Sequence, residues 1–180
     1  MPFFDSSFKE ILSSQAASIA GGLIAGTLIA LQADKLLLVP GMLILIPGFL
    51  EMRGNISGSF SSRLTSGLFL GVVKPDRFGT KIVKGNLLAS FLQAMIISFS
   101  LGVIAFLFNW LIFGVSSTGI IIFPVVAGII ANAMEIPLAL FITFYLFRKG
   151  HDPNNIMGPV ITSTGDIISV ISLLIAMVVI

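Results

Sequence analysis

The chain has 180 residues, of which 56% are hydrophobic and only 10% are charged, and its formal net charge is +2. Because an ordinary soluble domain carries about 25% charged residues, the polar side chains are too few to cover a soluble surface, and lipid is the expected solvent. The absence of cysteine excludes disulfide bonds and thiolate metal sites, and the small net charge gives no indication of nucleic-acid binding.

Five apolar stretches, each close to the roughly 20 residues that a spanning helix needs, predict membrane helices at 12–32, 36–53, 85–113, 118–147 and 154–180. The first ten residues lack the basic start and the cleavage site of a signal peptide, so we expect this lead-in to stay uncleaved as a cytoplasmic N-terminal segment. The predicted fold class is all-α: a polytopic membrane protein whose residues 1–180 form one domain, with no soluble regulatory domain.

The first two predicted helices differ in character. The first carries a stripe of small residues that suits close helix packing or a dimer seam: Ser18, Gly22, Gly26 and Ala30. The second is followed by Arg53-Gly54-Asn55 and a run of small residues before apolar residues resume through Val73, which predicts a broken extension to residue 73.

Polar residues inside the predicted spans are candidate cation ligands, because a charge at the bilayer centre costs about 3 kcal/mol or more on insertion scales. Glu51 and Asn55 are four residues apart and share a face of the second helix. Glu135 precedes a proline in the fourth helix, at a predicted kink. The alternative for both acids is an ion pair with Arg53 or Arg63.

The fifth predicted helix begins with Asp152 as its N-cap and Pro153 at its first helical position. At about 100° per residue, Asn155, Thr162 and Asp166 fall within a narrow arc of this helix. Asp166 lies roughly 20 Å along the helix from Pro153, at about 1.5 Å per residue, and is therefore deep in the membrane. A hydrogen bond from Asp166 to a neighbouring helix is the alternative interpretation.

The basic residues predict the orientation of the chain. One precedes the first span, and the others gather in the second and fourth breaks: Lys9, Lys74, Arg77, Lys81, Lys84, Arg148 and Lys149. By the positive-inside rule these breaks and the N-terminus are cytoplasmic, and the C-terminus is outside. Lys35 stands alone on the opposite side, and His151 is interpreted as an exposed loop residue.

The candidate ligands indicate a class of ion. Carboxylates, amides and hydroxyls are hard oxygen donors that suit Mg²⁺ or Ca²⁺, whereas zinc and copper favour cysteine and histidine. Mg²⁺ gives up its water reluctantly, so a path for it needs a few carboxylates around a hydrated ion rather than a complete protein cage.

Two groups of residues form recognisable motifs. The first group is Pro40, Pro47, Gly54-Asn55 and Ser62-Arg63-Leu64-Thr65. The second is Asp152-Pro153-Asn154-Asn155 with Pro159, Thr162, Ser163, Gly165 and Asp166. Together they resemble the membrane domain of the MgtE-type magnesium transporters, and they also resemble its eukaryotic solute-carrier relatives and their archaeal single-repeat counterparts. The resemblance covers nearly the whole chain.

The resemblance implies a five-helix subunit that forms a homodimer, with the cation path at the subunit interface and Asp166 at the central Mg²⁺ position. We therefore expect a Mg²⁺ channel or transporter of the cell membrane, whose metal-binding residues are Asp166, Glu51, Asn55, Thr162, Asn155 and Glu135. The bacterial members carry cytoplasmic regulatory domains, and we expect none in this chain, so their gating is not expected to transfer.

Two alternatives stay open. A Na⁺- or H⁺-coupled exchanger would use the proline and glycine breaks as moving parts. A non-transporting scaffold or accessory subunit would pair its intramembrane acids internally. An enzyme is not expected, because the sequence has no HExxH or GxSxG motif and no histidine in a predicted span.

Overall fold

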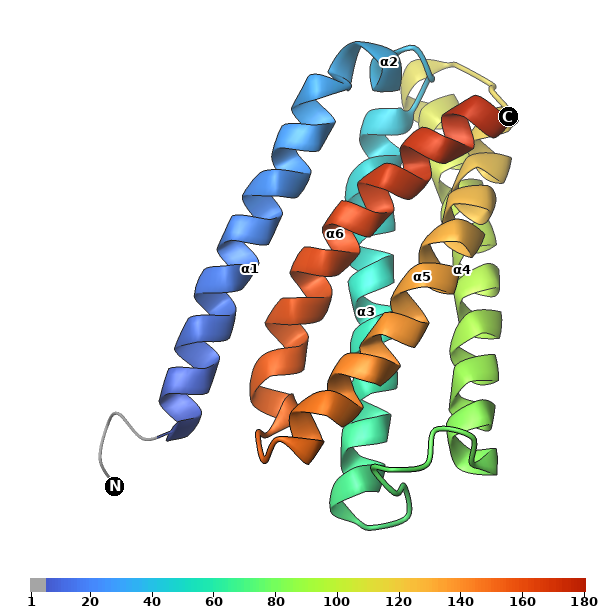
Figure 1. Ribbon diagram of the computed structural model, residues 1–180. Helices are drawn as coiled ribbons and strands as arrows, with labels where there is room; N and C mark the ends of the chain where they lie inside the picture. Colours follow the sequence, from blue (N-terminus) through green and yellow to red (C-terminus); the bar gives the residue numbers. More distant parts are fainter. Residues whose placement is uncertain (1–5) are drawn as a thin grey trace.

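The computed structural model describes residues 6–180, and these form six α-helices and no β-strand. Five helices are long: α1 (Ser6–Leu31), α3 (Met42–Phe69), α4 (Lys81–Phe113), α5 (Gly119–Arg148) and α6 (Pro153–Val179). The short helix α2 (Ala33–Leu37) connects α1 to α3, and the long helices run side by side as a bundle (Figure 1). The predicted all-α class is confirmed.

Four helices, namely α1, α4, α5 and α6, are long and apolar enough to cross a membrane. α3 has a similar length but is the least apolar of the long helices, because it contains Glu51, Arg53, Arg63 and several serines. A spanning α3, and with it the count of five spans, stays a prediction.

The predicted break in the second helix is not seen, because α3 is one continuous helix from Met42 to Phe69 with Pro47 inside it. Its polar side chains are accommodated at the bundle surface or by partners on other helices, so they do not interrupt the backbone. The helix also begins later than residue 36, since α2 and a turn at Gly41, with a φ of 82°, come first. It ends at Phe69 rather than at residue 73.

The other predicted boundaries lie close to those observed. The side chain of Asp152 accepts a hydrogen bond from the backbone N–H of Asn154 at 2.8 Å, and Pro153 opens α6, as predicted. Residues 6–10 of the predicted lead-in already belong to α1. The rest of the lead-in lies outside the described residues.

The helices form a four-helix bundle with an additional helix at its edge. α3, α4, α5 and α6 pack on one another, whereas α1 packs chiefly on α6, at the side of the molecule (Figure 1). The residues of α1 that face α6 are Ser14, Gly21 and Ala25. The predicted stripe therefore does not pack against α6, since a Cβ added at Gly22 or Gly26 would meet no other atom within 4 Å, and its alternative role as a dimer seam stays a prediction.

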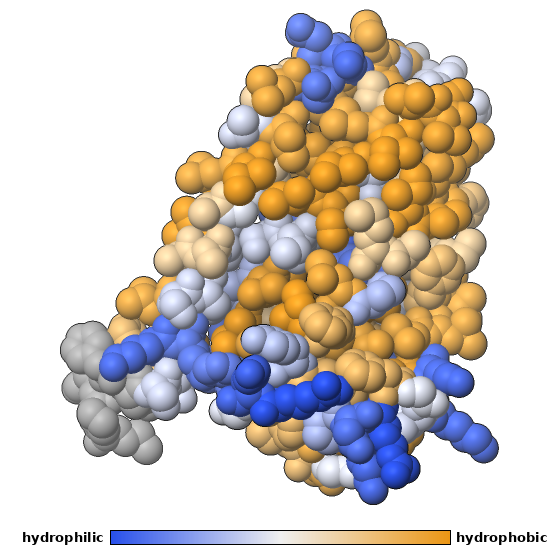
Figure 2. All heavy atoms as spheres, viewed as in Figure 1, coloured by the Kyte–Doolittle hydropathy of each residue, from blue (hydrophilic) through white to orange (hydrophobic). Residues whose placement is uncertain are grey.

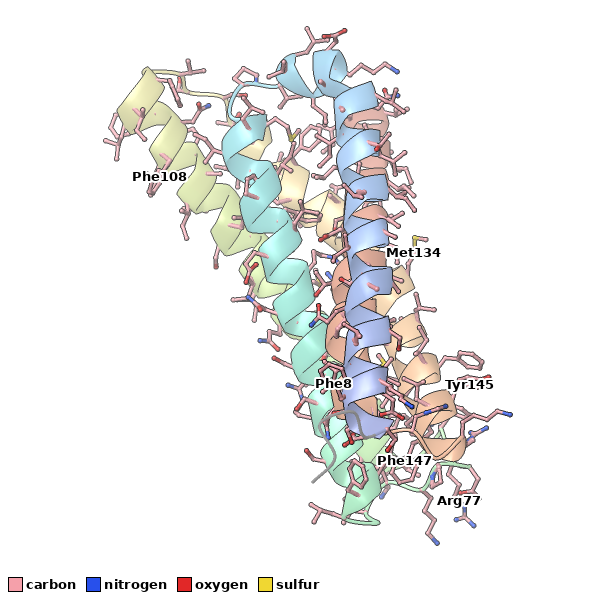
Figure 3. All side chains as sticks on the ribbon, turned by 90° about the vertical axis from the view of Figure 1, so that its left-hand side faces the viewer. Phe8, Arg77, Phe108, Met134, Tyr145 and Phe147 are labelled. Carbon is pink, nitrogen blue, oxygen red and sulfur yellow. The ribbon has the colours of Figure 1, made fainter. Side chains whose placement is uncertain are left out.

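Hydrophilic residues gather mostly at one end of the bundle, the lower end in Figure 2, whereas the opposite end shows one small hydrophilic group and the middle is mostly hydrophobic. One end holds the start of α1, the segment between α3 and α4 and the turn between α5 and α6 (Figure 1). Arg77 and Phe147 lie at this end, and Phe108 lies toward the other (Figure 3). Most of the lysines and arginines are therefore gathered at one end, as the positive-inside rule requires of a cytoplasmic face.

Candidate cation site

A groove of about 350 Å³ lies between α3 and α6. From α3 it is lined by Pro47, Leu50, Glu51, Gly54, Asn55 and Gly58, and from α6 by Gly158, Ile161, Thr162 and Asp166. The view in Figure 3 has α1 in front, with α3 running beside it. Four of the six predicted cation ligands therefore share one groove: Glu51, Asn55, Thr162 and Asp166.

Helical spacing brings these side chains together. Glu51 and Asn55 are one turn apart on α3, and Thr162 and Asp166 are one turn apart on α6, so each pair projects from one face of its helix. Glycines at 54, 58 and 158 leave the walls of the groove without side chains. A Cβ added at any of these three positions would meet no other atom within 4 Å, so the space beside them is open.

The two carboxylates of the groove have no cationic partner. The ion pairs among residues 6–180 join Arg53 to Glu135 and Glu10 to His151, and neither includes Glu51 or Asp166. Glu51 Oε1 accepts a hydrogen bond of 3.1 Å from Asn55 Nδ2, which leaves its charge in place. Glu51 and Asp166 line the same groove from two different helices. The groove therefore concentrates negative charge.

Glu51 is not paired with either nearby arginine, which was the alternative considered from the sequence. Arg63 instead donates hydrogen bonds to Asn86 Oδ1 at 2.9 Å and to Ser90 Oγ at 2.7 Å, both on α4. Its charge is thus directed away from the groove.

Glu135 lies elsewhere, because it forms an ion pair with Arg53 in the interior of the bundle. Arg53 also donates a hydrogen bond to Asn132 Oδ1. Both charged side chains are almost completely inaccessible, with exposures of 0% and 1%. This is the internal pairing that the sequence left as the alternative for Glu135, and we leave this residue out of the candidate site.

Asn155 also lies outside the groove. Its Nδ2 donates to Glu10 Oε2 at 3.0 Å, and its backbone carbonyl accepts from Ser14 Oγ at 3.2 Å. Asn155 therefore joins the start of α6 to α1, together with the contact of 2.8 Å between His151 Nδ1 and Glu10 Oε1. We leave Asn155 out of the site as well.

A second hollow of about 200 Å³ continues the groove toward the basic end, and the two share Gly58 and Gly158. Its polar lining consists of Ser61, Ser62, Thr65 and Asn154. Gly158, one turn before Thr162, was not recognised from the sequence. Gly158, Thr162 and Asp166 follow one another at intervals of four residues, and this spacing would have indicated that Gly158 lies on the same face of the helix.

The charge of the groove in the single chain is insufficient for a closed metal cage. In the described part of the chain, no group of three or more histidine, cysteine, aspartate or glutamate side chains is close enough to hold a metal ion. With two carboxylates and two other oxygen donors, the groove suits a cation that keeps most of its water.

Comparison with known proteins places these features in context. The model of the family MgtE, described as a divalent cation transporter, matches residues 46–176, which include α6 up to Ala176 and all but the first turn of α3. Solute carrier family 41 member 2 of Gallus gallus is 25% identical over 135 residues, which is 73% of this chain and 24% of that protein. The protein of the same name from Homo sapiens is 24% identical over the same share. The match therefore spans about a quarter of these relatives. No solved structure matches the chain.

Proposed function

Because the chain belongs to the MgtE family of divalent cation transporters, we propose that it moves Mg²⁺ across the cell membrane along the groove between α3 and α6. The observation that carries this proposal is the pair of carboxylates, Glu51 and Asp166, which line one groove without a cationic partner. A carboxylate inside a membrane protein is costly unless a cation or water accompanies it.

The path is formed between two copies of the chain. Glu51, Asn55 and Thr162 are exposed in the single chain, so the groove opens on the surface of the bundle. Lipid against the groove would leave the carboxylate of Glu51 without water or a cation, whereas a second protomer facing the first would enclose it. Two protomers would contribute four carboxylates, and this charge favours a divalent over a monovalent cation.

Hydration supports Mg²⁺ as the ion. The groove offers carboxylate, amide and hydroxyl oxygens together with open space beside three glycines, which suits a hydrated ion. The hydroxyl and amide groups of the second hollow extend this polar lining toward the basic end. A scaffold function would require the intramembrane acids to be paired, as Glu135 is, whereas Asp166 has no ion-pair partner among residues 6–180, which argues against it.

The proposal is tested by uptake of Mg²⁺ into liposomes that contain the purified protein. Removing the charge with Asp166→Asn should lower selective uptake by about tenfold or more, because the divalent ion loses its deepest carboxylate. Asp76→Asn is the matched control, since Asp76 is exposed in the segment between α3 and α4 and lies outside the groove. Near-normal selective uptake by Asp166→Asn would reject the assignment.

The same preparation tests the paired arrangement and the coupling. Light scattering should give the mass of two chains, and a monomer that takes up Mg²⁺ would contradict a path between protomers. A channel should conduct without a Na⁺ or pH gradient at a clamped membrane potential. Uptake that requires either gradient would identify a coupled exchanger instead.

A further inference from the structure

An arginine lies in the centre of the bundle, directly behind the groove. Arg53 is 0% exposed, and its guanidinium contacts two residues of α5, the carboxylate of Glu135 and the amide oxygen of Asn132. Asn132 is held in turn, since its Nδ2 donates to the carbonyl oxygen of Gly128 at 2.6 Å. An arginine does not lose its proton in proteins, so this charge must be neutralised by a partner.

This ion pair and the groove occupy the same level of the molecule. Arg53 lies in the turn of α3 between Glu51 and Asn55, with its side chain buried while theirs are exposed. On the other helix, a Cβ at Gly165 would come within 2.7 Å of Glu135 Oε1, and Gly165 immediately precedes Asp166. The Arg53–Glu135 pair therefore lies on the inner side of α3 and α6, within about one helical turn of Glu51 and Asp166, which line the groove.

From this arrangement we infer that Glu135 is a positioning residue for cation selectivity, which cancels the charge of Arg53 so that the groove keeps a net negative charge. The inference rests on the proposed function of the groove. Packed helices have axes about 8–10 Å apart, and at that separation in a medium of low dielectric constant a bare guanidinium would repel a divalent cation. The repulsion acts twice as strongly on a divalent as on a monovalent ion.

A purely structural role for the pair predicts a different pattern. If the ion pair only held α3 against α5, Glu135→Gln would lower the amount of folded protein, because it leaves a buried charge unpaired, but the apparent KM and the Mg²⁺-to-K⁺ selectivity of the folded protein would not change. If charge cancellation matters, removing both charges restores the electrostatics of the groove, even though the ion pair is gone.

The experiment measures the apparent KM for Mg²⁺ uptake and the Mg²⁺-to-K⁺ selectivity in liposomes. Glu135→Gln should raise the apparent KM by about tenfold and lower the selectivity, because Arg53 is left unneutralised. The double variant Arg53→Gln/Glu135→Gln should return the apparent KM to within about threefold of the unmodified protein. Glu135→Asp keeps the charge and should stay within the same range.

An apparent KM of the double variant that equals or exceeds that of Glu135→Gln would overturn the inference, and so would an unchanged KM in Glu135→Gln. If Glu135→Gln does not fold, the test relies on the double variant and on Glu135→Asp. A tenfold rise in the apparent KM of either variant would then overturn the inference. Asp166→Asn is measured in parallel. Normal Mg²⁺ uptake by Asp166→Asn would reject the proposed function itself. If Asp166→Asn loses uptake but the apparent KM of the double variant is not restored, only the role of Glu135 is rejected.

Discussion

Gly165 is the point at which α6 comes nearest to the buried ion pair. The carboxylate of Glu135 occupies the space that a side chain at this position would need. The absence of a side chain at position 165 therefore allows α6 to lie against α5 while Asp166, the next residue, lines the groove on the other side.

The substitution Gly165→Ala should destabilise the protein by about 1–3 kcal/mol, because an added methyl group overpacks a buried contact. Unfolding in detergent micelles, followed by circular dichroism, measures the loss. Gly158→Ala is the control on the same helix, since nothing lies within 4 Å of a Cβ there. A Gly158→Ala variant that loses as much stability as Gly165→Ala would contradict the explanation.

The sequence was informative for residues whose role follows from helical spacing. Glu51 with Asn55, and Thr162 with Asp166, were placed on shared faces by counting, and the structure brings the two faces to one groove. Asn155, which shares the arc of Thr162 and Asp166, and Glu135, which precedes a proline, lie elsewhere because each has a partner on another helix. Partners separated by 82 or 145 residues in the sequence cannot be chosen from local spacing.

At the scale of the helix, α3 shows why local signals mispredicted a break. Glycine, asparagine, serine and an arginine within a few residues usually mark the end of a membrane helix. Here Ser61 Oγ bonds Thr143 Oγ1 at 2.9 Å and Arg53 pairs with Glu135, so two polar side chains of α3 have partners on α5. Such partners lie far away in the sequence and are not visible to local signals.

The attachment of α1 is a second feature of this scale, because this helix packs chiefly on α6. The contact is close at Gly21, where a Cβ would collide with the side chain of Ser163. At the next residue, Gly22, an added Cβ would meet nothing within 4 Å. A single position therefore decides how near α1 lies to α6.

Gly21→Leu should move α1 away from α6 and uncover position 163. The chain contains no cysteine, so a Ser163→Cys variant carries one reactive thiol, which α1 should shield from a maleimide in detergent. Adding Gly21→Leu should speed its labelling by about tenfold, because local opening becomes easier. Adding Gly22→Leu should leave the rate unchanged, and equal acceleration by both would show that α1 does not pack through Gly21.

At the scale of the whole molecule, the charges at the two ends support the predicted orientation, which stays a prediction. Lys149 lies in the turn after α5, at the end that gathers the basic residues, and Ser116 lies between α4 and α5 at the other end (Figure 1). Both residues are exposed.

Single cysteines at these two positions should react with a membrane-impermeant maleimide from opposite sides. In intact cells Ser116→Cys should be labelled and Lys149→Cys should not, because the positive-inside rule places the basic end in the cytoplasm. Permeabilised cells, in which both should react, are the control. Labelling of Lys149→Cys alone in intact cells would reverse the orientation.

The pairing of α3 with α5 also has a consequence for how the protein is made. Asn132, a partner of Arg53, is synthesised 79 residues after it. At about 5–20 residues per second, the ribosome needs roughly 4–16 seconds to deliver α5 after Arg53 has been made. During that interval α3 is a poorly apolar segment with an unmatched guanidinium, and the arrival of α5 is the event that allows it to settle among the other helices.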